Sequence, residues 1–474
     1  MRRLRQLAAG TPAARERVVD LLRALAIVMV VLGHWAVAAI GYDAAGRPTG
    51  RSALGELPWA YPLTWVAQVM PVFFLVGGYA NAASLTARQA RGGDATGWLL
   101  DRGARLLRPT SALLLVLAGG ALVARIVGAR PDEIRTVVWF ATIPLWFLAA
   151  YLFVVPLTPV MYALHRRFGL LVPLALVALV AVGDLGRLVG PGTLAYGNYL
   201  FGWLAVHQLG FAWHDARSAP EHDRRGPRSR RLPPTRRVGL PLLLGGLGAA
   251  LVLTVVGPYP ISMLNMPGVR LDNAAPPSLA LLALATAQLG LILLLRDRAE
   301  RWLHRPRPWQ AVIAVNAVVL TVFLWHLTAV ILLVGALDAV HLLPTPQVGT
   351  AAWLAWRVPW LLLLAVVLAG LVAVFGRIEA RGGPAGQPRR DGTGRAARRP
   401  RTDGADPPHS AGRASARTLL TAGGYVAVVV GLVINSVTPK TAPEPLGVPV
   451  AALLAYLAGA GTLRLLRSGW GSRG

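Results

Sequence analysis

Three ionisable side chains within one apolar stretch are the first feature of this sequence that could do chemistry. Asp20, Arg23 and His34 lie in DLLRALAIVMVVLGHW. In an α-helix Arg23 and His34, eleven residues apart, differ by only ~20° in direction and ~16 Å along the axis, and Asp20 lies about one turn before Arg23. The acid and the guanidinium alone could be anchors at a membrane surface. His34 lies too far along the helix for that, so it is predicted to belong to a functional site.

A second pair of arginines and a second histidine could complete such a site. Arg105 and Arg108, in LLDRGARLLRP, are i and i+3 and therefore point the same way from one end of another apolar stretch. Guanidinium groups bind phosphate bidentately, so three arginines at one level would form a phosphate-binding site, and an ordinary basic flank is the alternative. His326, in LTVFLWHLTAV, is expected at the level of His34. It either shares a cavity with His34 or is bonded to a backbone carbonyl.

Two further motifs supply supporting candidates. Asn81 follows Gly77 and Gly78 in MPVFFLVGGYANAASL, where the glycines allow close helix approach or a break that lines a cavity. Trp146, in PLWFLAAYLF, forms either the aromatic wall of a pocket or lipid-facing packing. Two other residues within apolar stretches are weaker candidates of the same kind: His207 and Arg357.

The elements that must position these residues are membrane spans. Of the 474 residues 55% are hydrophobic and only 15% are charged, and the mean hydropathy is +0.52. Recurrent apolar runs long enough to cross a bilayer predict an all-α polytopic protein. The first run has no small-residue cleavage site after it and is expected to be a retained span. The expected spans are 18–40, 61–85, 109–124, 138–164, 168–186, 192–213, 241–257, 277–295, 309–335, 348–376, 418–436 and 448–463.

Charge fixes the expected orientation. With the N-terminus inside, 38 of the 48 lysines and arginines fall in cytoplasmic segments and eight in outer loops. This asymmetry predicts that both termini are cytoplasmic and that the protein crosses the inner (plasma) membrane many times. It also explains the net charge of +27 without nucleic-acid binding. The absence of cysteine excludes disulfides, thiolate catalysis and cysteine metal sites, and no metal is expected.

One composition change predicts the domain boundaries. Residues 379–417 have almost no large apolar side chains and are expected to be a disordered cytoplasmic linker. The chain then divides into a cytoplasmic tail (1–17), a ten-span core (18–378), this linker, and a two-span C-terminal hairpin with its tail (418–474). The basic segment 215–238 is expected to be a second disordered cytoplasmic stretch.

In these motifs the chain resembles the membrane-bound acyltransferase 3 family, bacterial O-acyltransferases that acetylate cell-surface and secreted glycans and some natural products. The resemblance covers residues 16 to about 376 and departs from the family at Gly77, where serine is usual. Many members end in a soluble esterase-like domain, where this sequence has a linker and two more spans. The motifs occur in the family's order: R-x10-H, FFLVGGY, R-x-x-R, LWFL and LWH.

The resemblance implies a catalytic base at His34 and an acyl-CoA site at Arg23, Arg105 and Arg108. Acyl-CoA, taken as acetyl-CoA, would be a co-substrate rather than a bound cofactor. The acceptor would be a hydroxyl of a cell-surface glycan, a glycolipid or another small molecule such as a secondary metabolite. Asp20 would fix Arg23, and His326 would orient the acceptor or hold the oxyanion.

Two rival functions use the same residues differently. A transporter of a lipid-linked or anionic solute would use the arginines as a substrate site, although no internal repeat of the kind common in transporters is found. A non-catalytic membrane scaffold is the third hypothesis, and it leaves His34 unexplained.

Overall fold

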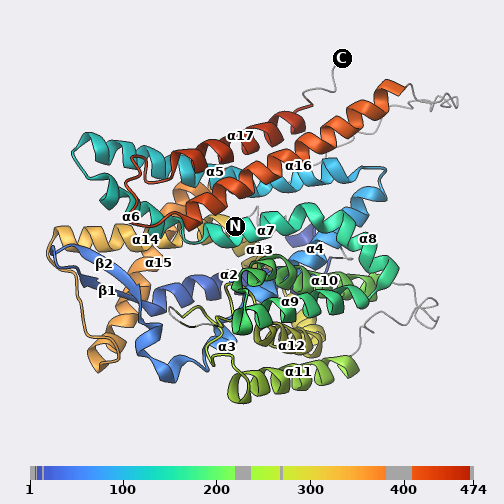
Figure 1. The fold of residues 1–474 in the computed structure, drawn as a ribbon, viewed down its shortest axis with the longest axis horizontal. Helices are drawn as coiled ribbons and strands as arrows, with labels where there is room; N and C mark the ends of the chain where they lie inside the picture. The colour runs from blue at the N-terminus through green and yellow to red at the C-terminus, as the bar shows by residue number, and fades with distance from the viewer. Residues whose placement is uncertain are drawn as a thin grey trace. The chain divides into compact units, whose positions relative to one another are not determined.

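The computed structural model of the protein describes residues 6, 8–12, 15–218, 236–266, 269, 271–380 and 408–469. It is almost entirely α-helical, which confirms the predicted all-α polytopic fold (Figure 1). Most of the predicted linker, and most of the predicted disordered stretch 215–238, lie outside the described residues. The chain forms two compact units, residues 1–92 with 140–374 and residues 93–139 with 375–474.

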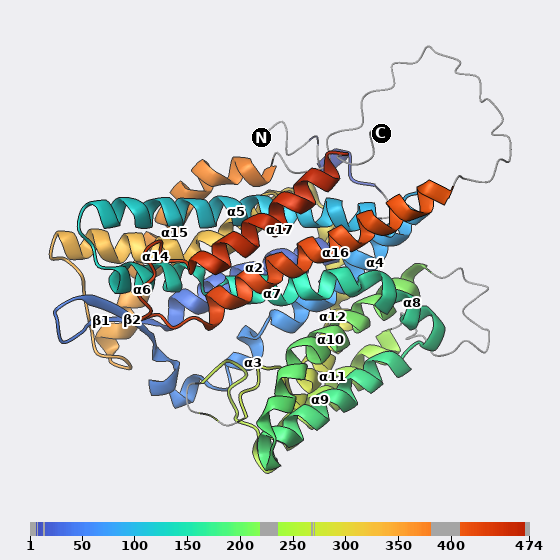
Figure 2. The same ribbon diagram turned by 45° about the horizontal axis from the view of Figure 1, so that its top comes forward.

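The first unit contains most of the helices. Figure 2 shows α9, α10, α11 and α12 as neighbours within it, and α2 lies against α4, α13 and α14. The helices of this unit are α2 (Arg17–Val37), α3 (Thr64–Ala67), α4 (Met70–Gln89), α7 (Leu145–Val154), α8 (Thr158–Phe168), α9 (Leu171–Val189), α10 (Asn198–Ser218), α11 (Arg236–Leu251), α12 (Leu279–Leu303), α13 (Pro306–Asn316), α14 (Val319–Ala339) and most of α15 (Ala351–Ala380).

Short elements join these helices. A π-helical turn, Val252–Val256, extends α11. The 3₁₀ turns are Ala53–Glu56, Pro58–Ala60, Val155–Leu157 and Gly192–Gly197. The ninth predicted span is broken in the structure, because α13 ends at Asn316 and α14 begins at Val319.

Eleven helices of the described chain are long and apolar enough to cross a membrane, against twelve predicted spans. The missing one is α10, which has 21 residues and is long enough to span, but is less apolar than the others. Its polar residues include His207 and Gln208, and both are fully buried, as is most of the helix. A helix that neighbouring helices surround has little contact with lipid, so it can carry polar side chains that lipid would exclude.

A β-hairpin interrupts the helical pattern directly after α2. The strands β1 (Ala38–Tyr42) and β2 (Pro48–Ser52) pair antiparallel, with Ala38 opposite Ser52. Tyr42 Oη donates to Asp338 Oδ1 at 2.8 Å, which ties the hairpin to the end of α14. The sequence did not predict this hairpin, which ends α2 three residues after His34.

The second unit joins one early span to the C-terminal pair. It contains α5 (Ala95–Ile126), most of α6 (Pro131–Thr142), α16 (Pro408–Val437) and α17 (Val450–Arg467), and Figure 2 shows α16 and α17 side by side along α5. Tyr425 Oη donates to the Leu99 carbonyl at 2.8 Å. The compact units therefore follow a different boundary from the sequence division at residue 378.

Arg135 is the polar centre of the second unit. Its side chain is fully buried, and it donates to Asn435 Oδ1 at 3.0 Å and to the Gly447 and Thr438 carbonyls at 2.9 and 2.8 Å. These bonds hold the turn between α16 and α17 against α6. An unpaired guanidinium would be costly at this burial, so the carbonyl acceptors are what allow the arginine here.

Candidate functional site

Two histidines from helices far apart in sequence meet in the first unit. His34 lies in the last turn of α2, and His326 lies on α14. The distance from His34 Nδ1 to His326 Nε2 is 2.9 Å, and the rings stack with centroids 5.0 Å apart and planes 17° apart. His326 is fully buried, whereas His34 is half-buried. The pair therefore has one inner member and one that other molecules can reach.

The neighbours of His326 fix which nitrogen carries each proton. His326 Nδ1 lies 2.6 Å from the Phe323 carbonyl oxygen, which can only accept a hydrogen bond. Neutral His326 is therefore protonated at Nδ1, and its Nε2 accepts a hydrogen bond from the Nδ1–H of His34. This leaves Nε2 of neutral His34 as a lone-pair acceptor, and it forms no hydrogen bond with the described residues. Such a nitrogen can act as a general base.

Two buried tryptophans hold the histidine pair in place. Trp35 Nε1 donates to the backbone carbonyl of His326 at 3.0 Å, and Trp360 Nε1 donates to the carbonyl of Trp35 at 3.0 Å. Their side chains are 2% and 1% exposed, so these indole N–H groups need internal acceptors. The bonds connect α2, α14 and α15 at the level of the pair. Sequence reasoning missed both residues, because nothing in a single sequence indicates which carbonyl an indole reaches.

Aromatic side chains form a wall beside His326. Phe323 lies 6.0 Å from the His326 ring, Phe147 packs edge-on against Phe323 at 5.4 Å, and Phe73 packs against Phe147 at 4.7 Å. Trp146, the predicted member of such a wall, is half-buried and packs edge-on against Phe147, with the ring centroids 6.3 Å apart. The wall beside His326 is therefore formed by Phe147, the residue after Trp146 in the same motif.

The glycine motif of α4 faces α7 and α10. A Cβ at Gly77 would lie 2.9 Å from the Tyr151 ring, and one at Gly78 would overlap the carbonyl oxygen of His207. Gly77 thus lets the Tyr151 side chain approach α4 closely, and Gly78 does the same for the α10 backbone. Asn81 Nδ2 lies 3.1 Å from His207 Nε2, and Asn81 is fully buried. Asn81 thus bonds to α10, and no hydrogen bond joins it to the histidine pair among the described residues.

The other end of α2 carries the predicted acid and arginine. Asp20 is buried and accepts from Arg15 at 2.7 and 3.1 Å and from Arg23 Nη1 at 3.4 Å. Asp20 therefore does contact Arg23, but its shorter bonds are to Arg15, which sequence reasoning did not select. Its bonds to Asp20 raise the pKa of Arg15, so this side chain remains a cation.

Arg105 and Arg108 lie on α5, in the second unit. Both are exposed, and their i, i+3 spacing places them on one side of the helix. Arg23 lies on α2, in the first unit, and the predicted three-arginine phosphate site stays a prediction.

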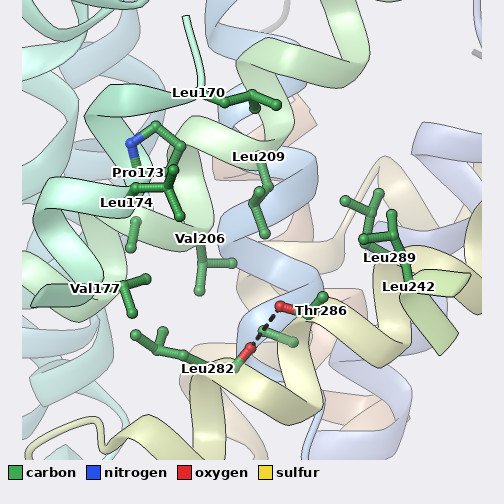
Figure 3. A pocket seen from close by; sticks show the side chains of 12 residues that line it. Leu170, Pro173, Leu174, Val177, Val206, Leu209, Leu242, Leu282, Thr286 and Leu289 are labelled. Carbon is green, nitrogen blue, oxygen red and sulfur yellow. Dashed lines mark hydrogen bonds between the residues drawn. The ribbon is translucent and has the colours of Figure 1, made fainter. Parts of the chain in front are cut away.

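An apolar cavity of ≈ 220 Å³ lies elsewhere in the first unit (Figure 3). Its walls come from α9, α10, α11 and α12, and none of its lining residues belongs to α2 or α14. Thr286 is its one polar side chain, and the Thr286 hydroxyl already donates to the Leu282 carbonyl at 2.9 Å. The cavity has no group for acid–base chemistry. Within the described residues, no three His, Cys, Asp or Glu side chains are grouped to hold a metal ion.

The fold and the histidine pair define a class: a polytopic helical membrane protein with two hydrogen-bonded histidines on two of its candidate spans. A family model described as "Acyltransferase domain" matches residues 17–376. The chain belongs to this family, the acyltransferase 3 family, as its motifs predicted, and is a membrane acyltransferase. No curated protein and no solved structure matches the chain.

Proposed function

We propose that the protein is an O-acyltransferase of the inner (plasma) membrane. It transfers an acyl group, taken as acetyl, from cytoplasmic acyl-CoA to a hydroxyl of a cell-surface glycan, a glycolipid or a secondary metabolite. The observation that carries this proposal is the His34–His326 hydrogen bond, because it leaves His34 Nε2 as an open proton acceptor. The family assignment supplies acyl transfer as the reaction class.

The reaction needs one base and one electrophile. His34 Nε2 takes the proton of the acceptor hydroxyl as its oxygen attacks the thioester carbonyl carbon. The tetrahedral intermediate collapses by breaking the carbon–sulfur bond, and the CoA thiolate takes the proton from the His34 imidazolium. The products are the ester and free CoA, and His34 is again neutral.

His326 acts as a positioning residue in this reaction. It contacts His34 Nδ1 and not the reacting atoms, and its own Nδ1–H is committed to the Phe323 carbonyl. The proton on His34 Nδ1 therefore stays in place while Nε2 gains and loses one. This division of roles is that of a base and the group that orients it.

Arg23, together with Arg105 and Arg108, is assigned to the binding site of the acyl-CoA donor. Along α2 the axial separation of Arg23 and His34 is about 16 Å, which matches the reach of an extended pantetheine arm. Arginine at these positions binds the phosphates of CoA bidentately. Arg23 forms a long ion pair with Asp20, in which Nη1 lies 3.4 Å from Oδ1.

The test uses purified full-length protein in liposomes, labelled acetyl-CoA and acceptor saccharides. His34→Ala is expected to lower transfer by about 10²–10⁴, the usual contribution of a general base. His304→Ala is the matched control, because His304 is an exposed histidine at the end of α12. Near-full turnover of correctly inserted His34→Ala would refute the catalytic role. Movement of a labelled solute without acetylation would favour the transporter.

The proposed orientation has a separate test. A reporter fused after residue 230 is expected to be active only as a cytoplasmic fusion, because basic residues concentrate in that connection. A reporter that is active only outside the cytoplasm would reverse the whole topology.

A further inference from the structure

We propose that Arg357 and the tryptophans around it form an acceptor subsite that selects acidic saccharides. The inference rests on the proposed function, because it assigns the acceptor class of that reaction. The residues form a small pocket on the first unit, and its main lining groups are Ile40, Pro346, Trp353, Trp356, Arg357 and Trp360.

Arg357 is a cation that has no counter-ion among the residues that the structure describes. It lies on α15, one of the spans, and forms no ion pair with a described residue. Its Nη1 donates to the Ala38 carbonyl at 2.8 Å and its Nε to the Trp353 carbonyl at 3.4 Å. Its guanidinium lies 4.4 Å from the Trp353 ring centre and 5.7 Å from that of Trp360. Cation–π contacts keep the charge in an apolar setting but do not neutralise it, so the site favours an anion.

A second observation concerns Trp353, another lining residue of the same pocket. Trp353 is only 4% exposed, and its Nε1 donor is buried with no acceptor in the described part of the chain. Buried indole N–H groups normally find a partner, and an unpaired one is costly. An oxygen of a bound carboxylate could accept from this donor and pair with Arg357. The cavity, ≈ 10 Å³, has room for one such oxygen-sized group.

The remaining lining residues suit a sugar ring. Trp356 is half-buried, so part of its side chain is open to a ligand outside the small cavity. An indole face is a large rigid apolar surface against which the C–H face of a sugar can stack. The combination of one anion-binding cation, one unpaired donor and an open aromatic surface fits a saccharide that carries a carboxylate.

Two successive hydrogen bonds link a wall of the pocket to the backbone of the histidine pair. Trp360 donates to the Trp35 carbonyl, and Trp35 donates to the His326 carbonyl. Ala38, which accepts from Arg357, lies one turn beyond His34, about 6 Å further along the chain direction. One or two sugar residues can span this separation. An acidic sugar held at Arg357 would thus present a hydroxyl to the base from the end of α2 opposite Arg23.

The experiment measures binding without acetyl-CoA, using full-length protein in nanodiscs. The two ligands are a glucuronate-containing tetrasaccharide and the same tetrasaccharide with its carboxylates reduced to alcohols. The wild-type protein is expected to bind the acidic form at least about tenfold more tightly, as for a hydrogen bond to a charged group. Arg357→Gln is expected to remove this preference, and Arg357→Lys to retain part of it.

Two variants control for folding and for general charge. Unchanged affinity of Arg357→Gln for the reduced tetrasaccharide shows that the variant is folded. Arg47→Gln removes an exposed arginine that pairs with Asp43 in the hairpin turn, and it is expected to leave the preference intact. Trp353→Phe keeps the ring but loses the N–H, and it is expected to weaken binding of the acidic form severalfold.

The outcomes separate this inference from the proposed function. Equal wild-type affinity for the two ligands, or an unchanged preference in Arg357→Gln, would overturn the subsite even if acetyl transfer is observed. Arg357-dependent binding with no acetyl transfer to any bound saccharide would support the subsite and overturn the proposed reaction.

Discussion

Removing His326 tests whether its hydrogen bond to His34 contributes to the proposed reaction. In His326→Ala the His34 Nδ1–H loses the acceptor that lies 2.9 Å away in the wild-type protein. Water or a backbone group must replace it, or the His34 proton moves to Nε2 and the base is lost. In His326→Gln a side-chain carbonyl oxygen is available as a substitute acceptor.

The size of the effect follows from that one hydrogen bond. Leaving a buried donor unpaired costs about 1–3 kcal/mol. If the productive tautomer of His34 carries this cost, kcat falls about 5- to 150-fold, since 1.36 kcal/mol corresponds to tenfold in rate. This loss is smaller than that expected for His34→Ala, about 10²–10⁴, because the base itself remains.

The assay compares initial rates of acetyl transfer in proteoliposomes over a range of acetyl-CoA concentrations. A positioning role predicts that kcat falls while KM for acetyl-CoA stays unchanged, because His326 contacts His34 and not the donor site. His326→Gln is expected to recover part of the rate that His326→Ala loses. A merely structural role would lower the amount of folded protein, which is measured separately by size-exclusion chromatography.

Two results would refute the reasoning. One is His326→Ala turnover within about twofold of wild type while His34→Ala is inactive, because the hydrogen bond would then contribute nothing. The other is His326→Gln being no better than His326→Ala at equal amounts of folded protein, because an acceptor at this position would then not matter.

Three further predictions concern packing and the donor site. Gly78→Ala should lower the free energy of unfolding by about 1–3 kcal/mol, seen as a lower Tm in detergent, because a Cβ there overlaps the α10 backbone. Arg135→Ala should destabilise the second unit by about 3 kcal/mol or more and speed tryptic cleavage at Lys440, because its carbonyl acceptors lose their donor. Arg105→Lys and Arg108→Lys should each raise KM for acetyl-CoA severalfold with little change in kcat, because lysine loses the bidentate geometry.

Matched controls exist for each of these changes. Gly119→Ala adds a Cβ with no heavy atom within 4 Å and should leave Tm unchanged or raise it slightly. Arg130→Ala removes only exposed ion pairs, with Asp132 and Glu133, and should not affect cleavage at Lys440. Arg125→Lys, near the other end of α5, should leave KM unchanged. Equal effects in a variant and its control would contradict the corresponding prediction.

Much of the fold could be predicted from apolar runs and their lengths. Eleven of the twelve predicted spans are long apolar helices of the described chain, and α10 is a helix of spanning length whose polar residues are buried. The length of an apolar run could not reveal the break between α13 and α14 or the hairpin after α2. In both places apolar residues continue beyond the point where the helix ends. It also could not show that the C-terminal pair packs with α5.

Part of the candidate site could likewise be predicted from the sequence, and part could not. Arg23 and His34 can be placed on one face of one helix from the sequence alone, because helical periodicity fixes angles and distances within a continuous element. The packing of the helices was needed to show that His326, 292 residues away, accepts a hydrogen bond from His34, and that Trp35 and Trp360 hold this contact. It also placed Phe147 rather than Trp146 next to Phe323, and Arg357 beside the end of α2. Periodicity predicts the direction in which a side chain points from the axis of its helix. The residue that this side chain contacts depends on how helices far apart in sequence pack together.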